Sequence, residues 1–451
     1  MKNIDMTGGS IPKLLLRFAV PLFLGGLLQQ LYSAFDAVVV GNYVGGDALA
    51  AVGASGPLIN VIIAFFMGMS MGASVLISQA FGAGDGKDVY GVIHTAVPLA
   101  VVLGVALSAT GIAITPSVLR MMKTPEQLMP GAIIYLRVYF SGLAAITVYN
   151  IGASILTAVG DTRRPLYFLT ISTVLHIICN LLLVIVFHIG IAGVACSTVF
   201  SEFVAAVLVI ATLCRTNGPN KLFLRSLRIS MSYVKRIVNI GLPGGLQSAI
   251  ISTSNLIVQS YINMLGADAV AGYSATSKLD AFIMLPIQTT AMTIATFVGQ
   301  NLGAGQPARA RKGVKTAMAG ALAVTFAISA ATLIFGRIFL RAFTPDEDII
   351  VYGIRFLNVF APLYFVLCFS QIIPGALRGA GDVRMAMFTC IGSFVGLRQI
   401  YLYVMTKIMY TPETVALSYP MTWAIAGAIL TIYYAKRDWS KFDQQGRQQK
   451  Q

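Results

Sequence analysis

The chain has 451 residues, of which 57% are hydrophobic and only 11% are charged. Soluble domains carry charge on about 25% of their residues, so a soluble chain this poor in charge would expose large apolar areas to water. The composition excludes an ordinary soluble enzyme and indicates an integral membrane protein. A net charge of +15 would suggest nucleic-acid binding in a soluble chain. Here the basic residues lie between apolar segments, where they set topology and meet anionic lipid, so no nucleic-acid partner is expected.

Apolar segments of helix length follow one another along the chain. A bilayer core of about 30 Å needs about 20 apolar residues per helix, and these runs are continuous rather than alternating, which excludes a membrane β-barrel. The sequence predicts an all-α membrane protein with twelve spans, at residues 14–43, 49–80, 90–115, 132–158, 165–187, 191–213, 237–263, 270–299, 313–336, 350–376, 385–406 and 413–434.

Basic residues are distributed unevenly between the two sides of the predicted spans. Both termini and the even-numbered loops hold 23 of the 32 Lys and Arg, which by the positive-inside rule places both termini in the cytoplasm. Residues 215–236 carry six Lys or Arg and no acid. The predicted domains are an N-terminal six-helix bundle at 1–214, a basic cytoplasmic linker at 215–236, a C-terminal six-helix bundle at 237–436, and a polar cytoplasmic tail at 437–451.

The two halves of the chain repeat each other at a displacement of 221 residues. The tetrapeptide GGDA at 45–48 corresponds to GADA at 266–269, GAG at 82–84 to GAG at 303–305, and GD at 160–161 to GD at 381–382. Because each half has an even number of spans, both enter the membrane in the same direction. Parallel repeats of this kind are related by an axis along the membrane normal, with the substrate path between them. The pattern predicts a transporter.

Signatures of catalysis are missing from the sequence. A phosphate-binding loop fails because Phe81 stands where the first glycine should precede Gly86-Lys87, so any pumping would draw on an ion gradient. The three histidines lack the spacing of metal ligands, and the five cysteines lack paired spacing. We therefore expect no enzyme, no cofactor and no metal site.

Acidic residues inside the spans are the main candidates for function, because charge is rare and costly in a membrane. Asp36 lies in the first span, about 33 Å of helix rise past its cytoplasmic start. An ionised Asp at the bilayer centre costs about 2.5–3.5 kcal/mol on insertion scales, so a proton and a cation can compete for it. Asp36 is thus a candidate coupling site, with silent pairing to a Lys or a hydroxyl as the alternative.

Glu202 in the sixth span and Asp280 in the eighth are candidates for a substrate or proton site. Hydroxyls just before Glu202 on its helix could satisfy a protonated carboxyl, and Lys278 could form a local ion pair with Asp280. Methionine is flexible enough to line an adaptable cavity. The remaining substrate-site candidates are Gln288, Met67 and Met284.

Taken in order, these features resemble the multidrug and toxic compound extrusion (MATE) family of transporters. The resemblance covers nearly the whole chain, except the tail after about residue 436. It rests on Phe35-Asp36 with Gly41, Gly-Ala-Gly after Gln79 and Gln300, AVGD at 158–161, GAGD at 379–382, Lys278-Leu279-Asp280 with Pro286, and Tyr419-Pro420 with Trp423.

The resemblance implies a V-shaped pair of bundles that exports organic, often cationic, drugs and toxic compounds in exchange for H⁺ or Na⁺ by alternating access. It implies a monomer in a bacterial cell membrane. It also implies that Asp36 binds the coupling ion, with Asn180 and Thr198 as polar neighbours. Many bacterial relatives place an acid four residues after the fifth-span Asn, where this chain has Val184. Either the ion site is simpler, or Glu202 compensates.

A flippase for a lipid-linked saccharide, from the wider superfamily, is the main alternative. It would need a strongly cationic cavity for pyrophosphate, whereas the spans offer mainly Arg398 and Lys278 against three acids. An intramembrane enzyme would need paired acids or a His/Asp pair on neighbouring spans, and the internal repeat disfavours it.

Overall fold

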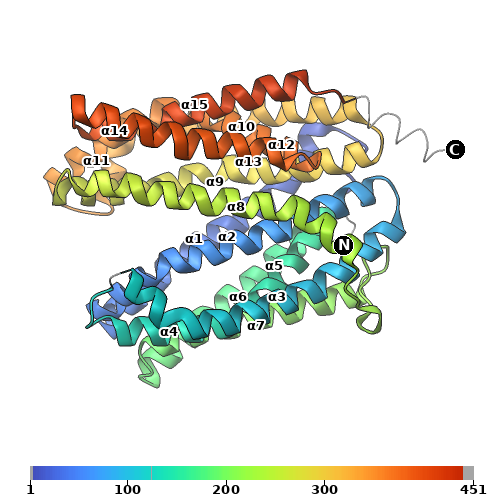
Figure 1. Ribbon diagram of the computed structural model, residues 1–451, viewed down its shortest axis with the longest axis horizontal. Coiled ribbons are helices and arrows are strands. Elements are labelled where there is room, and N and C mark those ends of the chain that lie inside the picture. The colour runs from blue at the N-terminus through green and yellow to red at the C-terminus, as the bar shows by residue number, and fades with distance from the viewer. Residues whose placement is uncertain (1–3, 123, 440–451) are drawn as a thin grey trace. The chain divides into compact units, whose positions relative to one another are not determined.

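The computed structural model describes residues 4–122 and 124–439, and over these ranges the chain is helical with short connections (Figure 1). Each predicted span coincides with one helix or with consecutive helical pieces. The first half contains α1 (Ile11–Val39), η1 (Val40–Val44), α2 (Gly46–Gly82), α3 (Gly86–Met121), α4 (Met129–Ser141), α5 (Leu143–Ala158), α6 (Arg163–Leu181), η2 (Leu182–Val186) and α7 (Ile191–Arg215).

The second half repeats this succession of long helices. After the short η3 (Leu224–Ser226) come α8 (Met231–Asn263), α9 (Ala267–Gly303), α10 (Pro307–Arg341), α11 (Glu347–Phe360), η4 (Ala361–Leu363), α12 (Tyr364–Gly379), α13 (Val383–Cys390), η5 (Ile391–Leu397), α14 (Arg398–Ile408) and α15 (Pro412–Lys436). Of the predicted polar tail, residues 440–451 lie outside the described part of the chain.

The helices form two compact units. Unit 1 contains the described residues up to Asp5 and Val20–Gly245, and unit 2 contains Met6–Ala19 and the described residues from Leu246 onward. The boundaries between the units therefore fall inside α1 and α8, and not in loops.

Each unit is built around one central helix. In unit 1, α5 packs against α2, α3 and α7; in unit 2, α12 packs in the corresponding way against α9, α10 and α15. Buried Leu156 and Val209 contribute to the apolar core of unit 1, and Leu340 and Leu357 to that of unit 2. The internal repeat of the sequence is thus matched by repeated helix packing.

Ten helices of the described chain are long and apolar enough to cross a membrane, or eleven if α4 and α5, bent by 48° at Gly142, count as one span. The seventh predicted span corresponds to α8, which does not meet this test. Its middle, residues 247–255, is rich in Ser, Thr, Asn and Gln, and these polar side chains lower the hydropathy of a helix that the sequence pattern still predicts.

The basic stretch between α7 and α8 belongs to unit 1 and contacts α3 of that unit. The loop between α7 and α8 covers residues 216–230. His94 on α3 accepts a hydrogen bond from the backbone N–H of Phe223 (3.0 Å), and its carbonyl oxygen accepts one from Arg228 N–H (3.2 Å). On α8, Arg236 forms a two-pronged ion pair with Asp88 (2.7 and 2.8 Å). The loop is therefore anchored to the start of α3.

Candidate functional site: a polar network on three helices of unit 1

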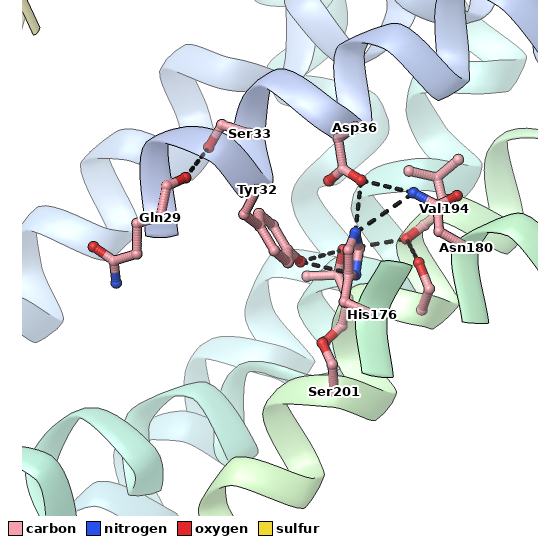
Figure 2. A network of polar contacts seen from close by, with 10 residues as sticks. Gln29, Tyr32, Ser33, Asp36, His176, Asn180, Val194 and Ser201 are labelled. Atoms are coloured by element: carbon pink, nitrogen blue, oxygen red, sulfur yellow. Dashed lines mark hydrogen bonds and ion pairs between the residues drawn. The ribbon is translucent and has the colours of Figure 1, made fainter. Parts of the chain in front are cut away.

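Three helices of unit 1 bring polar side chains to one point. Tyr32 and Asp36 lie one turn apart on α1, and His176 and Asn180 lie one turn apart on α6. Residues four apart share one face of a helix, so each helix presents two polar groups to the other. Thr198 on α7 completes the group. Figure 2 shows the ring of His176 between Tyr32 and Asp36, with Asn180 beside the carboxylate.

Short hydrogen bonds connect these side chains into one network. Asp36 Oδ1 lies 2.6 Å from His176 Nε2 and accepts a hydrogen bond of 2.7 Å from Asn180 Nδ2. The Tyr32 hydroxyl lies 3.0 Å from His176 Nδ1 and 3.1 Å from Thr198 Oγ1. Thr198 lies in turn 3.2 Å from the carbonyl oxygen of Val194. The network thus runs without a break from the carboxylate to α7.

The network is closed on one side and accessible on the other. His176 and Asn180 are fully buried, and Thr198 is nearly so. The Asp36 side chain keeps 18% of its surface exposed. A solute that approaches unit 1 therefore meets the carboxylate first, and the buried groups behind it fix its orientation.

Of the residues expected at this site, Asp36 and Asn180 are in direct contact, whereas Thr198 connects to the carboxylate only through Tyr32 and His176. Val184 lies in the π-helical turn η2 and packs with Val39 and Val40 in an apolar cluster. The position at which the family resemblance led us to expect an acid is therefore part of the packed core here.

Glu202 lies near this network but outside it. Its carboxylate is within electrostatic range of Tyr32, Tyr139 and Tyr149. The hydroxyls of Ser197, Thr198 and Ser201, which could satisfy a protonated carboxyl, reach carbonyl oxygens of their own helix. Atom Oε2 of Glu202 is buried without a hydrogen-bond partner.

Asp280 occupies a comparable position on α9 in unit 2. Its Oδ1 atom is buried without a hydrogen-bond partner, and the Tyr364 hydroxyl, close to it, also lacks one of regular geometry. The expected ion pair with Lys278 is not formed; the Lys278 ammonium instead lies 5.9 Å from the ring centre of Phe343.

The other substrate-site candidates lie on two helices. Met67 on α2 is exposed, Met284 on α9 is half-buried, and Gln288, one turn further along α9, is exposed. Met67 belongs to unit 1, whereas Met284 and Gln288 belong to unit 2. Among the described residues, no group of three or more His, Cys, Asp or Glu side chains could hold a metal ion.

Sequence reasoning missed Tyr32 and His176 as members of the site. A signal was available, because each lies four residues before a residue that was singled out, Asp36 and Asn180 respectively. That spacing puts both pairs on one helical face. The sequence does not show that these two faces meet.

The family of the protein follows from comparison with known sequences. The sequence model of the MatE family matches residues 21–182 and 243–404, once in each half of the chain. The protein is a multi-helical membrane transporter, and it belongs to the MatE family.

Individual relatives resemble the chain over nearly its whole length. It is 27% identical to the "Probable multidrug resistance protein YpnP" of Bacillus subtilis over 97% of this chain and 98% of that protein. It is 26% identical to the "Probable multidrug resistance protein NorM" of Thermotoga maritima, over 88% of this chain and 86% of that one. A structure described as the outward-facing conformation of a multidrug resistance MATE family transporter matches with a TM-score of 0.92 at 22% identity, over 98% of this chain and 99% of that one. This likeness shows the fold.

Proposed function

We propose that the protein is an antiporter that exports organic cations in exchange for protons, by alternating access. The observation that carries the proposal is the Asp36–His176 contact of 2.6 Å, which lies in a membrane helix bundle at the accessible edge of a buried network. A carboxylate and an imidazole in contact can share a proton, and the carboxylate alone can attract a cation.

Donors and acceptors can be matched in this network in two ways. In the first, Thr198 turns from Val194 to donate to Tyr32, and Tyr32, which donates to Thr198 in the structure, donates instead to Nδ1 of His176. The Nε2–H group of that histidine then donates to the ionised Asp36. In the second, Thr198 turns to the carbonyl oxygen of Val194 and accepts from Tyr32. His176 Nδ1–H then donates to Tyr32, and one further proton lies between Nε2 and Asp36.

These two arrangements differ by one proton and by the rotation of two hydroxyl groups. The Asp36–His176 pair carries one negative charge in the first arrangement and no net charge in the second. An organic cation is therefore attracted to the first and released from the second. Because each ligand shifts an equilibrium only by its differential affinity for the two states, this competition couples proton entry to substrate exit.

The architecture that supports exchange is the one expected from the repeat. We propose twelve spans, with α8 included, arranged as parallel six-helix repeats in domains 1–214 and 237–436, in a V-shaped monomer. Two matches of one family model, in the same order in both halves, support this arrangement. The excess of basic residues in the even-numbered loops supports cytoplasmic termini in a cell membrane, and the match to bacterial relatives such as YpnP supports a bacterial one.

Drugs and toxic compounds are the proposed cargo. The relatives from Bacillus subtilis and Thermotoga maritima are both described as probable multidrug resistance proteins, and one from Staphylococcus haemolyticus as a multidrug export protein. The anionic arrangement at Asp36 supports a cationic substrate class for this chain.

Sodium is the second candidate for the coupling ion, and one observation favours it. Asn180 Oδ1 is buried without a hydrogen-bond partner, close to the carboxylate of Asp36. Oxygen atoms of this kind suit a hard cation. Sodium would, however, compete with the N–H groups of His176 and Asn180 that already point at Asp36, which is why we prefer the proton.

Efflux of a fluorescent organic cation from proteoliposomes tests the proposal, with a pH gradient and a Na⁺ gradient imposed separately. We expect the pH gradient alone to drive efflux by the wild type, and Asp36→Asn to reduce efflux to that of empty liposomes. Asp47→Asn removes an exposed acid at the start of α2 and serves as the matched control. Efflux driven only by the Na⁺ gradient would identify Na⁺, and not the proton, as the coupling ion. Efflux under neither gradient would contradict antiport and favour the flippase.

A further inference from the structure

An arginine without an acidic partner is buried in the middle of a unit 2 span. Arg398 is 1% exposed and is the largest of the fully buried side chains. It lies in the span Val383–Ile408, ten residues before the end of that helix, which is about 15 Å of rise. A charge at this depth is costly, and such residues usually mark a functional path.

Neutral groups surround the guanidinium of Arg398. One terminal nitrogen donates to Asn255 Oδ1 (2.8 Å) and the other to Thr422 Oγ1 (2.9 Å). The central carbon of the guanidinium, Cζ, lies 4.5 Å from the ring centre of Tyr419 and 4.9 Å from that of Phe394. Atom Nε is buried without a hydrogen-bond partner. The planar group is thus held in place by aromatic rings while part of its donor capacity stays unused.

Asp280, a buried acid of the same unit, does not neutralise this charge by contact. Asp280 and Arg398 are both within electrostatic range of Tyr273 and Tyr419, whose hydroxyls share a hydrogen bond of 2.8 Å. No ion pair connects the acid and the base among the described residues. Unit 2 therefore holds one buried basic and one buried acidic group, both within electrostatic range of the same tyrosine pair and not in contact with each other.

The internal repeat places Arg398 at the position of His176. The two matches of the family model begin and end 222 residues apart, whereas the central motifs are 221 residues apart. A π-helical turn holds one more residue than an α-helical turn, and η5 ends at Leu397, directly before Arg398. With the additional residue placed in η5, position 176 corresponds to 398. Asp36 lies before the central motifs, and at the 222-residue displacement of the start of the match it corresponds to Val258.

The two equivalent positions therefore both carry a basic side chain but contact different partners. In unit 1 the residue on α6 contacts a carboxylate on α1, and in unit 2 the residue on α14 contacts an amide on α8, the helix equivalent to α1. Unit 1 offers an acceptor for positive charge. In unit 2, the Asn255 amide occupies the position beside the Arg398 guanidinium where an anion could bind.

We propose that Arg398 is a binding group for the carboxylate of transported compounds, so that the protein accepts zwitterions as well as simple cations. The inference rests on the proposed export function. A guanidinium binds a carboxylate through two parallel hydrogen bonds. Asn255 is exposed, so an incoming carboxylate reaches this amide first and can take its place on the guanidinium, where the unused Nε–H group provides a further donor.

A membrane lipid is a second source of an anionic group, and the depth of the arginine argues against it. Headgroups lie at the ends of the span, whereas Arg398 is about 15 Å of helix rise from its nearer end. The carboxylate of a small amphipathic solute can enter the bundle, and a lipid phosphate stays at the interface.

The experiment compares two fluorescent dyes that differ only at the carboxyl group. A rhodamine with a free carboxyl is a zwitterion, and its methyl ester is a cation of nearly the same shape. Their dissociation constants for the full-length protein in phosphatidylcholine nanodiscs are measured by fluorescence anisotropy, for the wild type, Arg398→Gln and Arg398→Lys. Arg337→Gln is the control, because it removes a like charge from an exposed ion pair with Glu347.

We expect Arg398→Gln to weaken binding of the free acid at least tenfold, the factor that corresponds to about 1.4 kcal/mol, and to change binding of the ester less than twofold. Arg398→Lys keeps the charge but cannot form two parallel hydrogen bonds, so it should weaken binding of the free acid by an intermediate factor. If the Gln variant does not fold, the Lys variant serves as the test. Arg337→Gln should change neither constant.

Equal losses for both dyes, or no loss for either, would overturn the carboxylate site and leave Arg398 a structural residue. If added phosphatidylglycerol abolishes the difference in free-acid binding between the wild type and Arg398→Gln, the guanidinium binds a lipid headgroup. That result would also overturn the carboxylate site. Because binding needs no gradient, a selective loss in a protein that fails to transport either dye would refute the antiporter and keep the site.

Discussion

The Asp36 carboxylate contacts two side-chain nitrogen atoms that come from one turn of α6. Asn180 and His176 both reach its Oδ1 atom, at 2.7 and 2.6 Å, and both are fully buried. Hydrogen bonds to a charged acceptor are about twice as strong as those between neutral groups. The carboxylate is therefore held in one orientation, and the histidine behind it gives a proton a second place to reside.

Tyr32 is the residue that connects the proton-binding pair to α7, and its hydroxyl tests the two-arrangement scheme. Tyr32→Phe removes the contacts with His176 Nδ1 and Thr198 Oγ1 and keeps the ring. A hydrogen bond contributes about 0.5–1.5 kcal/mol, so we expect pH-driven efflux from proteoliposomes to fall about three- to tenfold, with a loss of folding stability no larger than that amount. Tyr43→Phe, at an exposed tyrosine, is the control. Unchanged efflux by Tyr32→Phe would remove the hydroxyl relay from the scheme.

Asp36 could be predicted as a site residue from the sequence, whereas its partner His176 could not. Asp36 stands out because it is a charge within an apolar run, and that signal is local. His176 lies among Leu175 and Ile177 in a run that also reads as ordinary core. Its role depends on which face of α6 turns toward α1, and that is decided by packing between helices rather than by either helix alone.

Close contact between α9 and α12 depends on small residues at the centre of unit 2. A Cβ atom at Gly375 would lie 2.5 Å from the carbonyl oxygen of Ala291, and one at Gly379 would lie 2.3 Å from that of Ala295. Such distances leave no room for a methyl group. In membranes, where helices gain little from the hydrophobic effect, this kind of backbone approach is a main source of helix association.

Gly375→Ala should therefore push α9 and α12 apart. Overpacking of a dense interior costs about 1–3 kcal/mol, so we expect a lower unfolding temperature in detergent and a matching loss of functional yield. Gly320→Ala on α10 is the control, because a Cβ atom there meets nothing within 4 Å, and alanine favours helix. Equal unfolding temperatures for the two variants would contradict the close packing of α9 on α12.

Element lengths could be predicted from hydropathy, whereas interruptions could not. The bend between α4 and α5 occurs at Gly142, where a Cβ atom would collide with Val199 on α7. By contrast, Pro21 and Pro243 lie within continuous α-helices. Proline is the usual sequence signal for a kink, but packing decides where a helix breaks. The π-helical turns η2 and η5 contain no such signal.

The distribution of charge describes the molecule as a whole. Basic residues concentrate in the termini and the even-numbered loops, and the loop at 216–230 is fixed to unit 1 through His94. The positive-inside rule, which predicts the orientation of a single span, also predicts that of all the spans together. The sequence therefore predicts the topology, whereas the relation between the two polar networks needed the family match and the helix contacts.

Labelling with a membrane-impermeant thiol reagent tests this topology in a variant without native cysteines. Asn217→Cys lies exposed in the loop after α7, and Glu126→Cys lies exposed in the loop after α3. In right-side-out vesicles we expect the reagent to label position 126 at once and position 217 only after the membrane is permeabilised. The reverse pattern would place position 217 outside the cytoplasm and contradict the predicted orientation.

The most direct test of the central claim is a count of protons. The purified wild type, in a weakly buffered detergent solution, is titrated with a fluorescent organic cation while a pH indicator reports proton release. If the cation displaces the proton shared by Asp36 and His176, roughly one proton leaves per cation bound, because linkage between the two ligands is reciprocal. Asp36→Asn should release none. Cation binding without proton release by the wild type, or the same release by Asp36→Asn, would contradict the account.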